Sequence, residues 1–199
     1  MRAPSKVLFQ KIGAVAGIAA PAVGFSCILA AIASYPAFSW TNNALSDLGI
    51  VSGVTGPLFN FGLYACGLLT LNFAIFSLYR YFTGNWVGKI GSVFFSTAAL
   101  ALIGIGIFNE NFGETHFLFS VAFFVLLPIS LFIITAAFAL RHEQKNALLT
   151  IIVGIVAATP WILLFSIHYA SNVAIPETAS GLAGSAWIIG MAYKLLKQK

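Results

Sequence analysis

Three short stretches of the chain hold most of the residues that are suited to chemistry. The stretch "NNALSDLG" contributes Asn43, Ser46 and Asp47. The stretch "NENFGETHFLFS" contributes Asn109, Glu110, Glu114, His116 and Ser120, and "SIHY" contributes His168. Two histidines and one carboxylate are a common ligand set for a catalytic zinc ion, which keeps its fourth position open for water or substrate. We therefore treat Asp47, His116 and His168 as candidate metal ligands.

The remaining polar residues have assigned tasks in this catalytic hypothesis. Glu110 or Glu114 acts as general base on the metal-bound water, and Ser46 orients the site or the substrate. The candidate substrate-binding residues are Asn43, Asn109 and Ser120. A nucleophilic Ser46 or Ser120 with a histidine base is a weaker alternative, because serines are common at helix ends. Haem ligation by His116 and His168 is a further, less favoured option.

Each of these residues also has a purely structural interpretation. Asp47 and His116 are suited to capping backbone groups, and His168 to lying at the membrane interface beside Tyr169. Glu110 and Glu114 are near a helix start, where negative charge is favourable. The candidate ligands have no local spacing such as His-x-x-x-His, so the sequence does not force them together.

The elements that position these residues are membrane helices. Apolar residues make up 60% of the 199 residues and charged residues 8%, with a mean hydropathy of +0.96. These values lie far outside the range of soluble proteins. The net charge of +5 is spread along the chain in small groups, which argues against a nucleic-acid partner. Cys27 and Cys66 lie in apolar runs, where a disulfide framework has no role.

Six apolar runs have the length of about 20 residues that a spanning helix needs. They cover approximately residues 11–35, 58–79, 87–108, 117–140, 147–168 and 178–195. Their apolar character is continuous and does not alternate, which indicates helices and not barrel strands. The predicted fold is an all-α bundle of six transmembrane helices that forms one domain over residues 1–199.

The charged residues predict the orientation of this bundle. Every Lys and Arg falls in a segment that the six spans place on one side, and such residues stay on the cytoplasmic side. We therefore expect a multi-pass protein of the cell membrane with both termini in the cytoplasm. The acidic residues divide the other way: Glu143 lies inside, and the outside group is Asp47, Glu110, Glu114 and Glu177.

Aromatic residues gather towards the outer half of the predicted bundle. They are Trp40, Phe108, Phe112, Phe117, Trp161 and Tyr169. A pocket among them would have apolar walls suited to a lipid chain, while an interfacial belt produces the same pattern without a ligand. The belt is the favoured interpretation.

Two motifs and the six-helix layout resemble an uncharacterised membrane family, domain of unknown function 998. The motifs are "NALSDLG" at 43–49 and "GIFNENFGETHFLFS" at 106–120. The resemblance covers nearly the whole chain and implies a fold layout but no activity. A more distant analogy connects Ser46, Asp47, His116 and His168 with the zinc site of the alkaline ceramidase and adiponectin receptor superfamily. Those proteins typically have seven spans and a His-x-x-x-His pair on the last helix, which "TASGLAGSAWIIGMAYKLL" lacks.

The leading functional hypothesis is a membrane protein that binds, and with a metal ion hydrolyses, a lipid-like molecule at its outer face. Its expected partners are membrane lipid and a lipid-like small molecule. The alternative is a noncatalytic protein, either a permease for a small neutral solute or a structural partner. Either function depends on whether the outer loop, residues 36–57, turns into the bundle, because only then does Asp47 approach the histidines.

Overall fold

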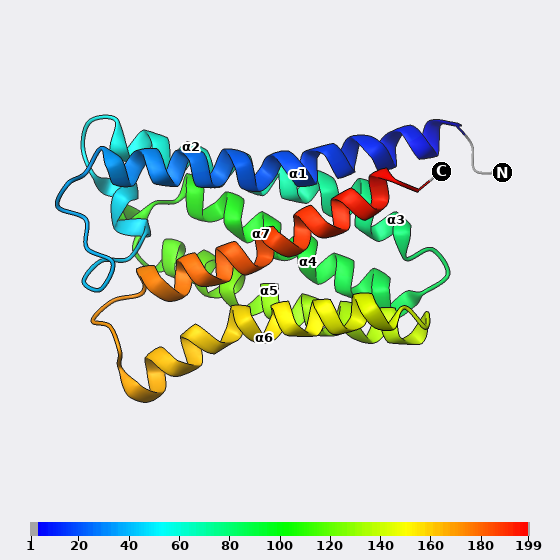
Figure 1. Ribbon diagram of the computed structural model, residues 1–199. Coiled ribbons are helices and arrows are strands. Elements are labelled where there is room, and N and C mark those ends of the chain that lie inside the picture. The colour runs from blue at the N-terminus through cyan, green and yellow to red at the C-terminus, as the bar shows by residue number, and fades with distance from the viewer. Residues whose placement is uncertain (1–3, 199) are drawn as a thin grey trace.

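Six long helices run lengthwise beside one another in the computed structural model, which describes residues 4–198 (Figure 1). The part of the chain so described contains helices and no strand. The six helices are α1 Pro4–Ala33, α2 Thr55–Phe73, α4 Trp86–Ile107, α5 Glu114–Leu140, α6 Gln144–Ile167 and α7 Ala174–Leu196. Each of the six predicted apolar runs corresponds to one of them, which confirms the all-α prediction.

Five of these helices are long and apolar enough to cross a membrane. The segments are Val7–Ala33, Thr55–Tyr81, Trp86–Ile107, Glu114–Leu140 and Gln144–Ile167. Helix α7 is not among them, because its first half, "AIPETASGLAGSA", is rich in small and polar residues. It nevertheless packs lengthwise against α1 and α6 and buries Trp187, Ile188 and Met191 (Figure 1). The chain is therefore a helical membrane protein in which five spans are supported by composition.

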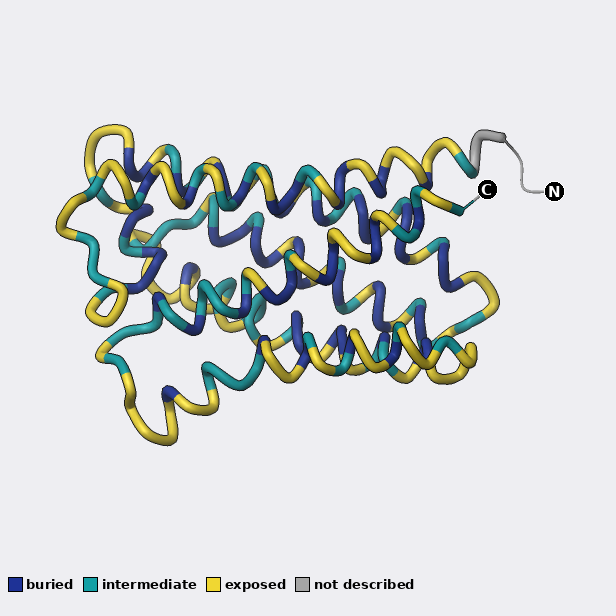
Figure 2. The backbone as a smooth tube through the Cα atoms, in the orientation of Figure 1, coloured by how far each residue is buried: buried dark blue, intermediate teal, exposed yellow. Residues whose placement is uncertain are grey.

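Helices α1 and α2 approach each other closely because two glycines face two cysteines. A Cβ atom on Gly62 would lie 2.4 Å from the Cβ atom of Cys27, and one on Gly24 would lie 3.0 Å from the Sγ atom of Cys66. Small residues at such crossings allow backbones to pack tightly in a membrane. Beyond this crossing, α2 continues through a π-helical turn, η2 Ala74–Leu78, into α3 Tyr79–Tyr81. Figure 2 shows the buried positions facing the neighbouring helices along the bundle.

The two ends of the bundle differ in charge. The acidic end contains the short helices η1 Ser46–Ile50 and η3 Glu110–Phe112 and the start of α7. The basic end contains the start of α1, the α3–α4 and α5–α6 connections and the last turn of α7 (Figure 1).

The long connection after α1 turns into the acidic end of the bundle. Its residues Leu45 and Leu48 are buried and pack in one apolar cluster with Ile28, Phe59 and Ala174. Backbone hydrogen bonds join it to the segment before α7, from Ser171 and Asn172 to Thr41 O and from Ala174 to Asn43 O. The burial of two leucines and these three bonds fix η1 against the helices, so its polar residues face the interior of the bundle end.

Candidate functional site

An internal cavity of about 100 Å³ lies between α1, α2, α4, α5 and α7, with η1 at its acidic end. Most of its wall is apolar, including Phe25, Phe59, Leu63, Phe95 and Phe123. An apolar cavity of about 150 Å³ in another protein stays dry and binds benzene or xenon. A cavity of this size and lining is therefore suited to an apolar group and poorly suited to water.

Polar groups of three different elements meet where this cavity reaches the acidic end. Ser46 of η1, Ser120 of α5 and Glu177 of α7 all line it there. Cys66, Thr70 and Ser185 are its other polar lining residues. The cavity thus combines a largely apolar wall with one end that carries two hydroxyl groups and a carboxyl group.

Glu177 is the ionisable residue that lines the cavity at this end. Its Oε2 atom accepts a hydrogen bond of 2.6 Å from the Leu45 backbone N–H, which connects α7 to η1. Burial, followed by the negative charges of Glu110 and Asp47, raises the pKa of Glu177 to about 8, although the Leu45 hydrogen bond acts in the opposite direction. The side chain therefore carries a proton through most of the neutral pH range.

Asp47 and Glu110 form a second layer of carboxylates beside Glu177. The Oδ2 atom of Asp47 accepts hydrogen bonds from the Asn43 Nδ2 atom at 2.6 Å and the Ala44 backbone N–H at 3.1 Å. Glu110 lies close to Ser46, Asp47 and His116. Burial and the Asp47 charge raise the pKa of Glu110, while the Ser46 hydroxyl and His116 partly offset this.

His116 is a buried residue, 8% exposed, in the first turns of α5. Its Nδ1 atom lies 2.7 Å from the Phe108 carbonyl oxygen, and its Nε2 atom lies 3.3 Å from the Ser120 Oγ atom. Because a carbonyl oxygen only accepts, Nδ1 carries the proton in the neutral ring and Nε2 accepts from Ser120. His116 therefore closes the bend between α4 and α5 and fixes the hydroxyl that lines the cavity.

The other predicted site residues are not at the cavity. Asn43 caps the loop: its Oδ1 atom accepts from the Ser39 N–H at 2.9 Å while its amide donates to Asp47. Asn109 caps η3 through an Oδ1 contact of 3.2 Å with the Asn111 N–H. Glu114 is exposed in the first turn of α5. His168 is exposed and ends α6 with a left-handed backbone, φ 49°.

The proposed metal ligands are not assembled into a metal site. Asp47 is engaged in capping, His116 bonds to Phe108 O and Ser120, and His168 makes no side-chain hydrogen bond in the described chain. Over residues 4–198 no group of three or more His, Cys, Asp or Glu side chains is arranged to hold a metal ion. The described residues therefore do not fit a zinc centre.

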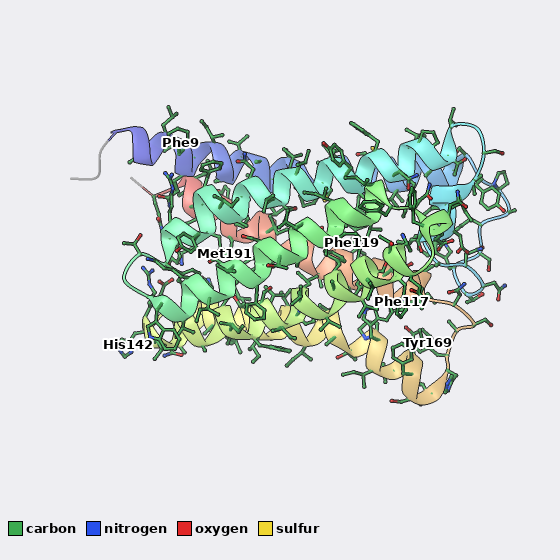
Figure 3. All side chains as sticks on the ribbon, turned by 180° about the vertical axis from the view of Figure 1, so that it is seen from behind. Phe9, Phe117, Phe119, His142, Tyr169 and Met191 are labelled. Atoms are coloured by element: carbon green, nitrogen blue, oxygen red, sulfur yellow. The ribbon has the colours of Figure 1, made fainter. Side chains whose placement is uncertain are left out.

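The aromatic residues predicted near the outer end do not line the cavity. The cavity wall uses a different set: Phe25, Phe59, Phe95, Phe123 and Phe124. Phe117 and Tyr169, labelled in Figure 3, are 65% and 36% exposed. Trp161 is close to the wall without belonging to it, with its ring 4.7 Å from that of Phe124.

Sequence reasoning missed two features of this site. Glu177 was assigned to the outer side as a charge and was not identified as a site residue. The available signal was its isolation, since it is the single charged residue between Lys145 and Lys194. The cavity wall had no comparable signal, because apolar residues that face a cavity and those that face lipid are of the same types.

The fold and the cavity together define a polytopic helical membrane protein with an internal, mostly apolar site. Comparison with known families agrees: residues 18–194 match the family described as "Protein of unknown function (DUF998)". The chain belongs to this family. No curated protein and no solved structure matches it.

Proposed function

We propose that this protein is a six-span protein of the cell membrane, with both chain ends in the cytoplasm, that binds a single-chain lipid-like molecule. The apolar chain of the ligand enters the cavity, and its polar head lies at the acidic end, beside Ser46, Ser120 and Glu177. The observation that carries this proposal is the cavity itself, whose apolar wall ends in polar groups from three elements.

The size and lining of the cavity favour this ligand class. Burying apolar surface is favourable by about 25 cal/mol for each Å² removed from water. A volume of about 100 Å³ accepts part of one chain and excludes a second chain beside it. A ligand with one chain and a polar head matches both the space and the position of the polar groups.

The protein binds this lipid-like molecule and does not hydrolyse it. Zinc-dependent hydrolysis lacks its metal site among the described residues. The Ser120–His116 pair is four residues apart on one helix, where side chains are neighbours in any case. Their hydrogen bond is therefore explained by the helix without assigning a nucleophile.

The experiment that tests this proposal compares two identical substitutions on α7. Gly181 lines the cavity, and a Cβ atom there meets only Phe25, at 3.5 Å. Gly190 is exposed, and a Cβ atom there meets nothing within 4 Å. Gly181→Leu fills the cavity, whereas Gly190→Leu adds the same side chain to the outer surface of the same helix.

The readout is photo-crosslinking of the full-length protein in lipid nanodiscs with a diazirine derivative of dodecanol. Gly181→Leu is expected to reduce saturable labelling about tenfold, which corresponds to about 1.4 kcal/mol. Gly190→Leu is expected to label like the wild type. Equal labelling of all three proteins, or labelling that does not saturate, would overturn the proposal.

A further inference from the structure

The charges around the cavity indicate which polar head the ligand carries. Resting on the proposed function, we infer that the cavity selects single-chain amphiphiles with a protonated amine head, and that the ammonium group binds the carboxylate of Glu177. The apolar wall alone does not select a head group, because a wall of phenylalanine and leucine accepts any apolar chain. The polar end of the cavity must make that selection.

Among the residues that the structure describes, no Lys or Arg lies at the acidic end of the bundle. Asp47, Glu110 and Glu177 lie close enough together for each to influence another's ionisation. The described Lys and Arg residues all belong to the basic end: Lys6, Lys11, Arg80, Lys89, Arg141, Lys145, Lys194 and Lys197. A phosphate, sulfate or carboxylate head would be repelled at this site, whereas a cation would relieve the repulsion among the three carboxylates.

The hydrogen-bonding groups at the cavity also match an ammonium group. Over residues 4–198 the carboxyl group of Glu177 has one hydrogen-bond partner, the Leu45 N–H on Oε2. The Ser46 and Ser120 hydroxyl oxygens line the same end of the cavity. An ammonium group has three N–H donors and no acceptor, so one carboxylate and two hydroxyl oxygens are a suitable set of partners.

The titratable groups at this end of the cavity determine how the affinity for an amine depends on pH. They are Asp47 from η1, Glu110 from η3, His116 from α5 and Glu177 from α7, and the lining residues of α1, α2 and α4 add only the Cys66 thiol. With the pKa of Glu177 at about 8, the carboxyl group must lose a proton before it pairs with an ammonium group. An alkylamine has a pKa of about 10.4, like lysine, so it is charged throughout this range. Amine affinity should therefore rise from pH 6 to pH 8.

The test uses three competitors that share one chain: dodecylamine, dodecanol and dodecanoate. Each displaces the diazirine probe from the full-length protein in nanodiscs of zwitterionic lipid at pH 6, 7 and 8. The expected order at pH 8 is amine, then alcohol, then carboxylate, with at least about tenfold between amine and alcohol. The amine is also expected to gain up to about fiftyfold in affinity between pH 6 and pH 8, because the ionised fraction of Glu177 rises by that factor, while the alcohol changes little.

Two Glu→Gln variants separate the cavity from the general surface charge. Glu177→Gln keeps an oxygen acceptor for the Leu45 N–H and is expected to remove the amine preference and its pH dependence, while dodecanol still displaces the probe. Glu114→Gln, an exposed acid at the same end, should leave both unchanged.

The possible failures point to different conclusions. If none of the three amphiphiles displaces the probe, the proposed function itself is wrong. If the amine and the alcohol compete equally, or if Glu114→Gln weakens amine binding as much as Glu177→Gln, the cavity binds a chain but does not select an ammonium head.

Discussion

One glutamate at each end of the bundle shows how neighbours decide the behaviour of a carboxylate. Glu143, at the basic end, is surrounded by donors and cations, and Glu177, at the acidic end, by other carboxylates. Burial raises the pKa of both, but the bonds from Lys194 and Tyr81 outweigh burial at Glu143 and lower its pKa. The same residue type therefore has a lowered pKa among cations at one end and a raised pKa among carboxylates at the other.

The basic end is held together through the carboxylate of Glu143. Lys194 on α7 and the Tyr81 hydroxyl on α3 donate to it at 2.5 Å, and the Arg141 Nε atom lies 3.0 Å from its Oε1 atom. Asn146 adds a bond of 2.6 Å. The Arg141 guanidinium lies 4.4 Å from the centre of the Tyr81 ring. Three separate segments thus converge on one acid.

Removing that acid is expected to have the largest effect. Glu143→Ala leaves Lys194, Arg141 and the Tyr81 hydroxyl without their acceptor, and breaking a buried pair costs about 3 to 5 kcal/mol. The side chains of Glu143, Arg141 and Lys194 are 21% to 33% exposed, which reduces the expected loss to about 2 to 3 kcal/mol of unfolding free energy. Thermal unfolding of the purified protein in detergent measures this loss, and Glu114→Ala is the control with an exposed acid.

The pH dependence gives the same prediction a second readout. Because the folded pKa of Glu143 is lowered, its contribution is present above its unfolded pKa of about 4.5 and is lost as the pH falls through the lower folded value. The difference in unfolding free energy between wild type and Glu143→Ala should therefore become smaller below pH 4.5. A Glu143→Ala protein as stable as Glu114→Ala at pH 7 would contradict this account of the basic end.

The two histidines of the acidic end provide the next comparison. His116→Ala removes a buried ring and its bonds to Phe108 O and Ser120, and should cost about 2 kcal/mol. His168→Asn replaces an exposed residue with one that tolerates its left-handed backbone, so stability should change by less than about 0.5 kcal/mol. Unfolding in the presence and absence of a chelator measures both effects. A metal shared by the two histidines would instead make the two losses similar and the wild type sensitive to the chelator.

The helices were predictable from the sequence because lipid imposes a strong and local requirement. A continuous apolar run of about 20 residues has one solution in a bilayer, so each of the six runs became a helix. The polar stretch that begins at Asn43 was predicted to lie outside the apolar runs, and in the structure the Asn43 amide donates to the Asp47 carboxylate within this connection. Helix α7, predicted as the sixth span, is not among the five helices that are long and apolar enough to cross a membrane, because "TASGLAGSA" lowers its hydropathy.

The site was not predictable in the same way because its contacts join distant parts of the chain. Glu177 meets Leu45 across 132 residues, and the cavity wall draws on five helices. His116 and His168 lie at the same end of the bundle, as expected, yet one is buried in the α4–α5 bend and the other is an exposed helix cap. Knowing the membrane side of a residue therefore does not determine which neighbour it meets.

The last comparison makes a Glu→Gln change at each end of the bundle and begins with Glu177 at the acidic end. Glu177 has a raised folded pKa, so the folded protein binds a proton more tightly than the unfolded chain, and stability falls as the pH rises from about 4.5 to about 8. Glu177→Gln removes this titration and keeps an acceptor for the Leu45 N–H, so the variant should be equal to wild type near pH 5. At pH 9 it should be more stable than wild type, because the buried carboxyl group of wild type has then lost its proton while the glutamine stays neutral. Glu143→Gln at the basic end should lower stability at both pH values, because it removes the charge that Lys194 and Arg141 need. Thermal unfolding of both variants at pH 5 and pH 9 compares the two ends directly, and a loss of stability in both at pH 9 would show that Glu177 is a satisfied structural acid with no place for a cationic ligand.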